Sequence, residues 1–142
     1  MRRIVVFVLL VQGFCWIKVS AQKDIQHKES TILANNEFAI TGKLIGRDTG
    51  SIVLLYFDKT GKFVKDTATL NRGTFKFKGS ITEPTRAQLV GDLTSTRMSD
   101  PNKTVVFLEP GYLQLELPEG HFLKAKLLGS NTQNEFDKFH KM

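Results

Sequence analysis

Residues 74–78 read Thr-Phe-Lys-Phe-Lys, a strict alternation of polar and large apolar side chains. Successive side chains of a β-strand point to opposite faces, so Phe75 and Phe77 are expected to face a core while the two lysines face water. The preceding residues, Asn71-Arg72-Gly73, are typical of a hairpin loop because Gly readily adopts a positive φ. This stretch therefore predicts a β-hairpin with one buried face.

The same rhythm continues on both sides of this hairpin, with short apolar or alternating runs separated by turn residues. Strands are predicted over residues 38–44, 52–57, 63–70, 74–78, 86–90, 104–108, 113–117 and 122–128. The run 52–57 is apolar on both faces and is expected to be a central strand covered on each side. About eight short strands without an interior helix predict an all-β domain over residues 36–129, an antiparallel β-sandwich or a partly open barrel.

The last residues of the chain follow a different pattern. Ser130 or Asn131 can cap a helix that starts at about Thr132, in which Phe136 and Phe139 lie at helical spacing. A helix this short is marginal alone and needs a surface to pack against. We expect residues 130–142 to form a short C-terminal helix, the start of a linker that is missing here.

The first residues have the features of a secretory signal peptide. Arg2 and Arg3 precede an apolar stretch, and Val19-Ser20-Ala21 supplies a small-residue cleavage pattern. The alternative is an uncleaved anchor, although the stretch is short for a membrane span. We expect residues 1–21 to be the signal peptide and residues 22–35 to be a polar, flexible lead. Cys15 is the only cysteine, so the mature chain would hold no disulfide, thiolate metal site or redox couple.

The charge of the chain gives little support for nucleic-acid binding. The formal net charge is +6, but three basic residues and no acidic ones lie in residues 1–21. Without that segment, 17 basic residues face 14 acidic ones along the rest of the chain. Nucleic-acid binding requires several Lys or Arg on one face. We therefore expect no nucleic-acid partner, and contact with a membrane only through the signal peptide during export.

The side chains that usually carry catalysis do not form a recognisable motif. His27, His121 and His140 are the only imidazoles, and no HxH, HExxH or GxSxG pattern is present. The carboxylates fall mostly in expected turns, where Asp caps backbone N–H groups. We expect no enzyme, no metal and no cofactor, although a carboxylate pair that meets only in space would escape this reasoning.

Two features keep other functions open. The long loop over residues 91–103, together with Tyr112 after the Pro-Gly turn, could form a glycan- or peptide-binding surface. Most other aromatic residues occupy inward strand positions and are expected in the core. Asp66-Thr67-Ala68 resembles the acceptor pattern for O-glycosylation of Bacteroidota envelope proteins, while Thr67 can equally be a plain strand residue.

A family resemblance spans about residues 36–140. The residues that carry it include Gly73-x-Phe75-x-Phe77-x-Gly79, Phe107-Leu108-Glu109-Pro110-Gly111 and Gly129-Ser130-x-Thr132-x-x-Glu135-Phe136. This succession resembles the domain of unknown function 4369, which typically precedes a thioredoxin-like domain in secreted Bacteroidota proteins. The usual partner domain with its Cys-x-x-Cys is missing, so the redox activity of such proteins carries over to no residue of this chain. The resemblance implies a β-sandwich-like fold, an envelope location and an accessory role.

These observations lead to a functional hypothesis with two alternatives. The first hypothesis is a secreted, non-catalytic accessory domain in the periplasm or cell envelope of a Gram-negative bacterium. It would dock a thioredoxin-fold envelope protein through Phe136 and Phe139, the apolar anchors of the terminal helix. The alternatives are a glycan- or peptide-binding sandwich that uses Tyr112, and, ranked last, an enzyme that uses paired carboxylates.

Overall fold

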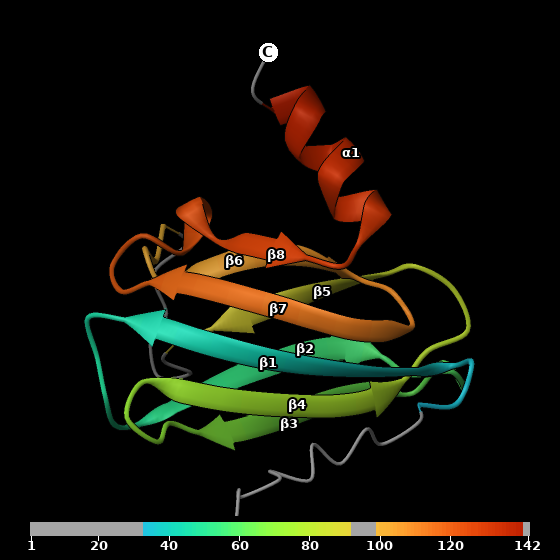
Figure 1. Cartoon of the computed structure of the whole chain (residues 1–142), viewed down its shortest axis with the longest axis horizontal. Coiled ribbons are helices and arrows are strands. Elements are labelled where there is room, and N and C mark those ends of the chain that lie inside the picture. Colours follow the sequence, from blue (N-terminus) through green and yellow to red (C-terminus); the bar gives the residue numbers. More distant parts are fainter. Residues whose placement is uncertain (1–32, 92–98, 141–142) are drawn as a thin grey trace, which may run out of the picture. The chain divides into compact units, whose positions relative to one another are not determined.

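A computed structural model describes residues 33–91 and 99–140 (Figure 1). The predicted signal peptide over residues 1–21 and almost all of the predicted lead lie outside the described residues. Most of the long loop, residues 92–98, also lies outside them. The described residues form eight strands in two sheets that are not closed into a barrel, a short 3-10 turn and one C-terminal helix. The predicted β-sandwich class is confirmed.

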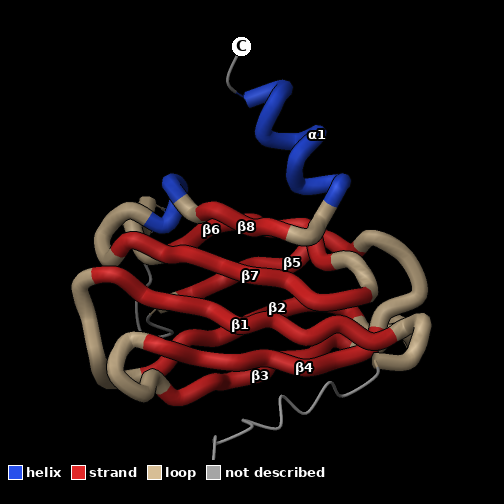
Figure 2. The backbone as a smooth tube through the Cα atoms, viewed as in Figure 1, coloured by secondary structure: helices blue, strands red, loops and turns tan. Residues whose placement is uncertain are grey.

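Each sheet contains four strands. The first sheet has the order β4-β1-β7-β8, with bounds β1 (Glu37–Ile45), β4 (Thr74–Ser80), β7 (Gly111–Pro118) and β8 (Lys126–Leu128). The second sheet has the order β3-β2-β5-β6, with bounds β2 (Ser51–Phe57), β3 (Phe63–Thr69), β5 (Thr85–Val90) and β6 (Lys103–Leu108). The two sheets lie face to face, and loops gather at both ends of the strands (Figure 2).

One strand pair departs from the predicted antiparallel arrangement. β1 pairs with β7 in parallel, with Ile40 opposite Leu113, while all other named pairs are antiparallel. Parallel neighbours need a long crossover connection. Here the chain supplies it by building the whole second sheet and β4 between β1 and β7.

The core lies between the two sheets and is filled by alternating side chains. Phe75 and Phe77 are buried as predicted, while Lys76 and Lys78 are exposed. Phe38 packs edge-to-face on Tyr56, with ring centroids 5.3 Å apart. Gly42 lies against the ring of Phe75, in a space that a Cβ atom could not share. Gly79 in β4 is crowded in the same way by Tyr56 and Phe38, so the core is packed closely enough to favour glycine at two strand positions.

The prediction of a single strand over residues 122–128 was wrong. Phe122–Lys124 forms the 3-10 turn η1, and only Lys126–Leu128 forms a strand, β8. The side chain of Phe122 is fully buried, and its N–H donates to the carbonyl of Pro101 at 2.8 Å. This contact holds the backbone away from β7, so pairing with β7 begins only at Lys126.

The expected cover on both faces of the strand over residues 52–57 is incomplete. β2 is a central strand, and its residues Ile52, Leu54 and Tyr56 are buried. Phe57, however, is 56% exposed and packs edge-to-face on the equally exposed Phe63, with ring centroids 5.5 Å apart. These two rings form a cross-strand pair on the outer face, where they stabilise the hairpin and not the core.

Candidate functional site

One side of the sandwich, which we call the open side, carries a groove. β6 and β8 are the edge strands of the two sheets there, and α1 (Asn131–His140) rises beside them (Figure 1). The groove has a volume of about 720 Å³. Its lining comes from β5 and β6, from the segment η1–β8, and from α1. The groove therefore lies between the edges of the two sheets and is lined by both sheets and by α1.

The backbone of β6 faces the groove at alternate residues. The N–H of Phe107 donates to Oε1 of Gln133 at 2.9 Å and so points away from β5. Because alternate residues of a strand present N–H and C=O to the same edge, Val105 has the same orientation. Within residues 33–91 and 99–140 no partner for the N–H of Val105 is found. β6 therefore offers an incomplete hydrogen-bonding edge.

A carboxylate from the end of β6 fixes the start of α1. Oε1 of Glu109 accepts hydrogen bonds from the backbone N–H of Thr132 at 2.7 Å and from its hydroxyl at 2.6 Å. The hydroxyl of Ser130 accepts from the N–H of Gln133 at 3.1 Å, which confirms Ser130 as the cap of the two candidates. The helix itself begins at Asn131, one residue before the predicted start.

The same contacts shift the titration of Glu109. Burial raises the pKa of its carboxyl, but the hydrogen bonds from Thr132, Asn131 and Ser130 together outweigh burial and hold the pKa below its ordinary value. The positive end of the helix dipole, at the start of α1, also stabilises a negative charge at this position. Glu109 therefore stabilises α1 in its ionised form.

Two further contacts fix the first turns of α1 on the sandwich. The buried side chain of Gln133 accepts from the N–H of Phe107 and donates to Oδ1 of Asp137 at 2.8 Å. The ring of Phe136 packs on that of Phe107, with centroids 5.1 Å apart. α1 is thus held by a capping carboxylate, a backbone hydrogen bond and an aromatic pair.

The two predicted helix anchors have different roles in the structure. Phe136 lines the groove and packs on β6, so it attaches the helix to the sandwich. Phe139 lies one turn further along and is 75% exposed. Of the two, only Phe139 is available to a partner without disturbing α1.

Tyr112 and the described ends of the long loop lie at opposite ends of β6. Tyr112 is 61% exposed and lines a shallow hollow with Leu33, Pro110 and Gly111. It follows β6, whereas the loop precedes β6, and a strand of 6 residues is about 20 Å long. The described ends of the loop therefore do not meet Tyr112, and residues 92–98, on which the predicted binding surface depends, lie outside the described residues.

Potential metal ligands do not gather among residues 33–91 and 99–140. No group of three His, Cys, Asp or Glu side chains that could hold a metal occurs among these residues. Among the described residues that line the groove, Asp137 is the one acidic residue, and it accepts a hydrogen bond from Gln133. Elsewhere Glu119 pairs with Arg47 at 3.5 Å and accepts from Asn102 at 3.2 Å, contacts that brace the end of the long loop.

Sequence reasoning named Ser130 and Phe136 but missed Glu109, Gln133 and Val105, which also build the open side. Ser130 and Gln133 have the spacing of a capping box, a signal that could have indicated the polar role of Gln133. No local signal marks Glu109, because its partner Thr132 is 23 residues away. The edge position of Val105 depends on strand order, which alternation does not reveal.

The comparisons with known proteins give one match. A family model described as "Domain of unknown function (DUF4369)" matches residues 38–136, which span every described strand except the start of β1, and most of α1. No curated protein and no solved structure matches the chain. In residues 33–91 and 99–140 no helix is long and apolar enough to cross a membrane.

Proposed function

The chain belongs to the DUF4369 family of domains of unknown function, and from this premise we propose that it is a secreted, non-catalytic interaction domain of the cell envelope. Its docking surface is the open side, where α1 presents Phe139. The partner is a thioredoxin-fold envelope protein.

The observation that carries this proposal is the contrast between the two ends of α1. A helix of 10 residues is marginal alone, yet its first turns are fixed by Glu109, Gln133 and the ring of Phe136. Beyond these contacts Phe139 is left 75% exposed. A large apolar side chain on a helix that is already fixed in place suits a binding anchor, because little conformational entropy is lost when a partner covers it.

The nature of the partner is supported by the resemblance and by the cysteine content. Members of the family typically precede a thioredoxin-like domain, and this chain has no Cys-x-x-Cys. Its single cysteine, Cys15, lies in the proposed signal peptide. Any thiol chemistry connected with this domain would therefore belong to the partner.

The proposal of export is supported by the first 21 residues. Arg2 and Arg3, the apolar stretch and Val19-Ser20-Ala21 together have the order of a signal peptide. Amino-terminal sequencing of the protein recovered from the periplasmic fraction should begin at Gln22. Recovery of an intact Met1 terminus in the membrane fraction would favour the uncleaved anchor.

Pull-down from the native envelope, read by mass spectrometry, tests the docking surface. The bait is the mature chain, and the variants are Phe139→Ala and a chain cut before Ser130. Phe63→Ala is the matched control, because it removes an exposed phenylalanine on the other side of the sandwich. We expect a thioredoxin-fold protein with the mature chain and with the control, and its loss with both helix variants.

Two results would overturn this proposal. One is recovery of the thioredoxin-fold protein with the chain cut before Ser130. The other is the absence of any thioredoxin-fold protein from the mature-chain sample, confirmed with purified candidates of that fold. Equal recovery with Phe139→Ala and with the mature chain would reject Phe139 as the anchor.

A further inference from the structure

We propose that the groove of the open side binds an extended, acidic peptide segment, which adds to β6 as a further strand of the second sheet. This inference rests on the proposed function, because it names a second element of the partner that the same side would recognise. Strand addition to an open sheet edge is a common form of peptide recognition, in which backbone hydrogen bonds give affinity and side-chain pockets give specificity.

The first argument is the hydrogen-bonding edge of β6. The N–H groups of Val105 and Phe107 both point into the groove, and Gln133 already accepts from Phe107 as the carbonyl of a neighbouring strand would. Within residues 33–91 and 99–140 the N–H of Val105 has no such acceptor. An added strand would supply it, and α1 would limit how far that strand extends.

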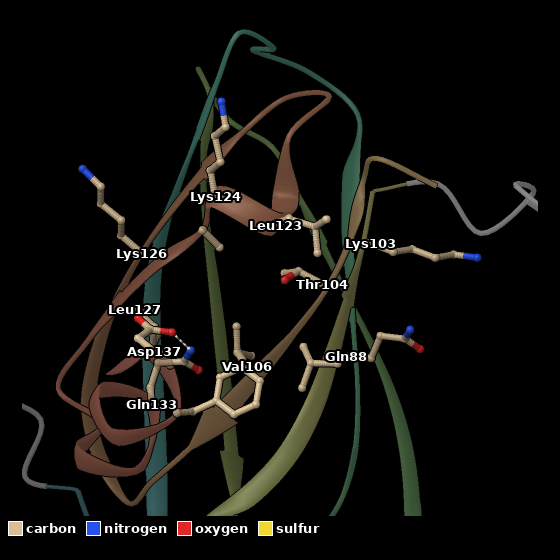
Figure 3. Close-up of a pocket in the computed structure, with 13 residues that line it drawn as sticks. Gln88, Lys103, Thr104, Val106, Leu123, Lys124, Lys126, Leu127, Gln133 and Asp137 are labelled. Carbon is tan, nitrogen blue, oxygen red and sulfur yellow. Dashed lines mark hydrogen bonds between the residues drawn. The ribbon is translucent and has the colours of Figure 1, made fainter. Parts of the chain in front are cut away.

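The second argument is the apolar surface inside the groove. Val106 and Leu127 lie at its base, and Leu123 from η1 extends toward its centre although it is 85% exposed (Figure 3). The volume of about 720 Å³ lies within the range of binding sites. Every second side chain of an added strand could pack here, and covering Leu123 would remove apolar surface from water.

The third argument is charge, which selects an acidic occupant. Lys124 and Lys126 lie on one side of the groove and Lys103 on the other (Figure 3). Asp137, the one acidic residue of the lining within the described part of the chain, already accepts a hydrogen bond from Gln133. The outward side chains of an added strand would approach these lysines, so carboxylates there increase both affinity and association rate.

A synthetic peptide provides the direct test. The probe is a short acetylated and amidated peptide in which Glu and Val alternate, carrying a fluorophore for anisotropy measurements on the mature chain. We expect saturable binding, and weaker binding of the matched peptide in which Lys replaces Glu. Absence of saturable binding at millimolar protein, or equal binding of the two peptides, would overturn the proposal.

Variants of β6 test the backbone hydrogen bond. Val105→Pro removes the N–H that faces the groove, and because this N–H points away from β5, the pairing of β5 with β6 is retained. We expect at least about a five-fold weaker affinity, the effect of one lost hydrogen bond. Val105→Thr keeps the N–H and is the matched control, with unchanged affinity. Equal binding by the two variants would reject strand addition.

N-methylated peptides make the same test without altering the protein, in case Val105→Pro does not fold. Alternate N–H groups of a strand point to opposite edges. Methylation of every Val nitrogen and methylation of every Glu nitrogen should therefore differ, with only one of the two peptides retaining affinity. Similar affinity of both would reject strand addition.

A charge-reversal pair tests the lysines. Lys124→Glu combined with Lys126→Glu should weaken binding of the acidic peptide and strengthen binding of its Lys counterpart. Lys43→Glu combined with Lys76→Glu makes the same change of net charge on exposed positions of β1 and β4. This control should leave both affinities almost unchanged, and an equal effect of the two pairs would reject local recognition.

The outcomes separate this inference from the proposed function. Phe139-dependent recovery of a thioredoxin-fold protein without peptide binding would remove the groove proposal and leave the function standing. Peptide binding without recovery of a thioredoxin-fold protein would support the groove proposal and remove the proposed thioredoxin-fold partner. Dimerisation of the mature chain that Val105→Pro abolishes, measured by sedimentation, would assign the groove to a second copy and overturn the acidic peptide.

Discussion

The two sides of the sandwich differ in how the edges of the two sheets are connected. On the side formed by β3 and β4, which we call the closed side, the chain passes from one sheet to the other through a tight hairpin, and Asn71 and Thr74 exchange hydrogen bonds of 2.9 and 3.0 Å. On the open side the sheet edges β6 and β8 are separated by a groove. Apolar packing fills the space between the sheets from one side to the other, and on the open side polar contacts from Glu109 and Gln133, together with the rings of Phe107 and Phe136, also place α1.

This difference indicates which part of the domain can acquire a binding function without loss of the fold. Burial of alternating apolar side chains holds the two sheets together, and these side chains carry no polar atoms that would need hydrogen-bond partners. The open side depends on a few directional contacts that fix a helix and leave an edge strand uncovered. Removing a core side chain should therefore affect the whole domain, while changes on the open side should affect α1 and binding.

The largest expected effect comes from Phe38→Ala. Phe38 is fully buried and packs on Tyr56, so its removal should lower the free energy of unfolding by about 3–5 kcal/mol. Urea denaturation measures the change. The matched control is Phe63→Ala, whose ring is 55% exposed and which should cost much less. Similar losses in the two variants would contradict the assignment of the core.

A smaller loss is expected from Gly42→Ala in β1. The new methyl group would overlap the ring of Phe75, and overpacking of this kind costs about 1–3 kcal/mol. The same denaturation experiment measures it. In the double variant Gly42→Ala/Phe75→Leu the overlap is relieved, so the two losses should be less than additive. Strict additivity would show that the two residues do not interact.

The closed side was largely predictable from the sequence, and the open side was not. The alternation of Phe75 and Phe77 is local information, so a strand and its buried face follow from a few adjacent residues. Residues 122–128 resemble a single strand in sequence, yet the hydrogen bond from Phe122 to Pro101 accompanies a 3-10 turn over Phe122–Lys124. Alternation does not record such distant contacts.

The groove was beyond prediction for a related reason. It exists because β6 and β8 are the edges of their sheets, and strand order follows from long-range pairing such as that of β1 with β7. Phe136 and Phe139 were both recognised on the terminal helix. Only the contact of Phe136 with Phe107 distinguishes the attached ring from the exposed one.

An intermediate effect is expected from Glu109→Gln on the open side. The neutral side chain weakens the cap of α1 and its interaction with the helix dipole, which should lower stability by about 1 kcal/mol at neutral pH. Amide hydrogen exchange within α1 and urea denaturation measure the change. Glu135→Gln, an exposed position on the same helix, is the matched control and should have little effect.

The same pair of proteins has a defined pH dependence. The pKa of Glu109 in the folded chain lies below its ordinary value of 4.5, so its stabilising contribution is complete above that value. The contribution is lost as the pH falls through the lower, folded pKa. The difference in stability between the unmodified chain and Glu109→Gln should therefore shrink in acid, and a difference that stays constant would show that the charge of Glu109 is not the cause.

The smallest expected effect on stability comes from Phe139→Ala, which compares two rings of the same helix. Phe139 is mostly exposed, so its removal should change the free energy of unfolding by less than about 0.5 kcal/mol. Phe136→Ala breaks the contact with Phe107 and should cost about 0.5–1.5 kcal/mol and accelerate amide exchange in α1. Equal losses would mean that Phe139 also packs on the sandwich, and the anchor would no longer be available. If Phe139→Ala leaves the free energy of unfolding unchanged, any loss of partner binding is attributable to the missing ring, because the contacts that hold α1 on the sandwich are intact.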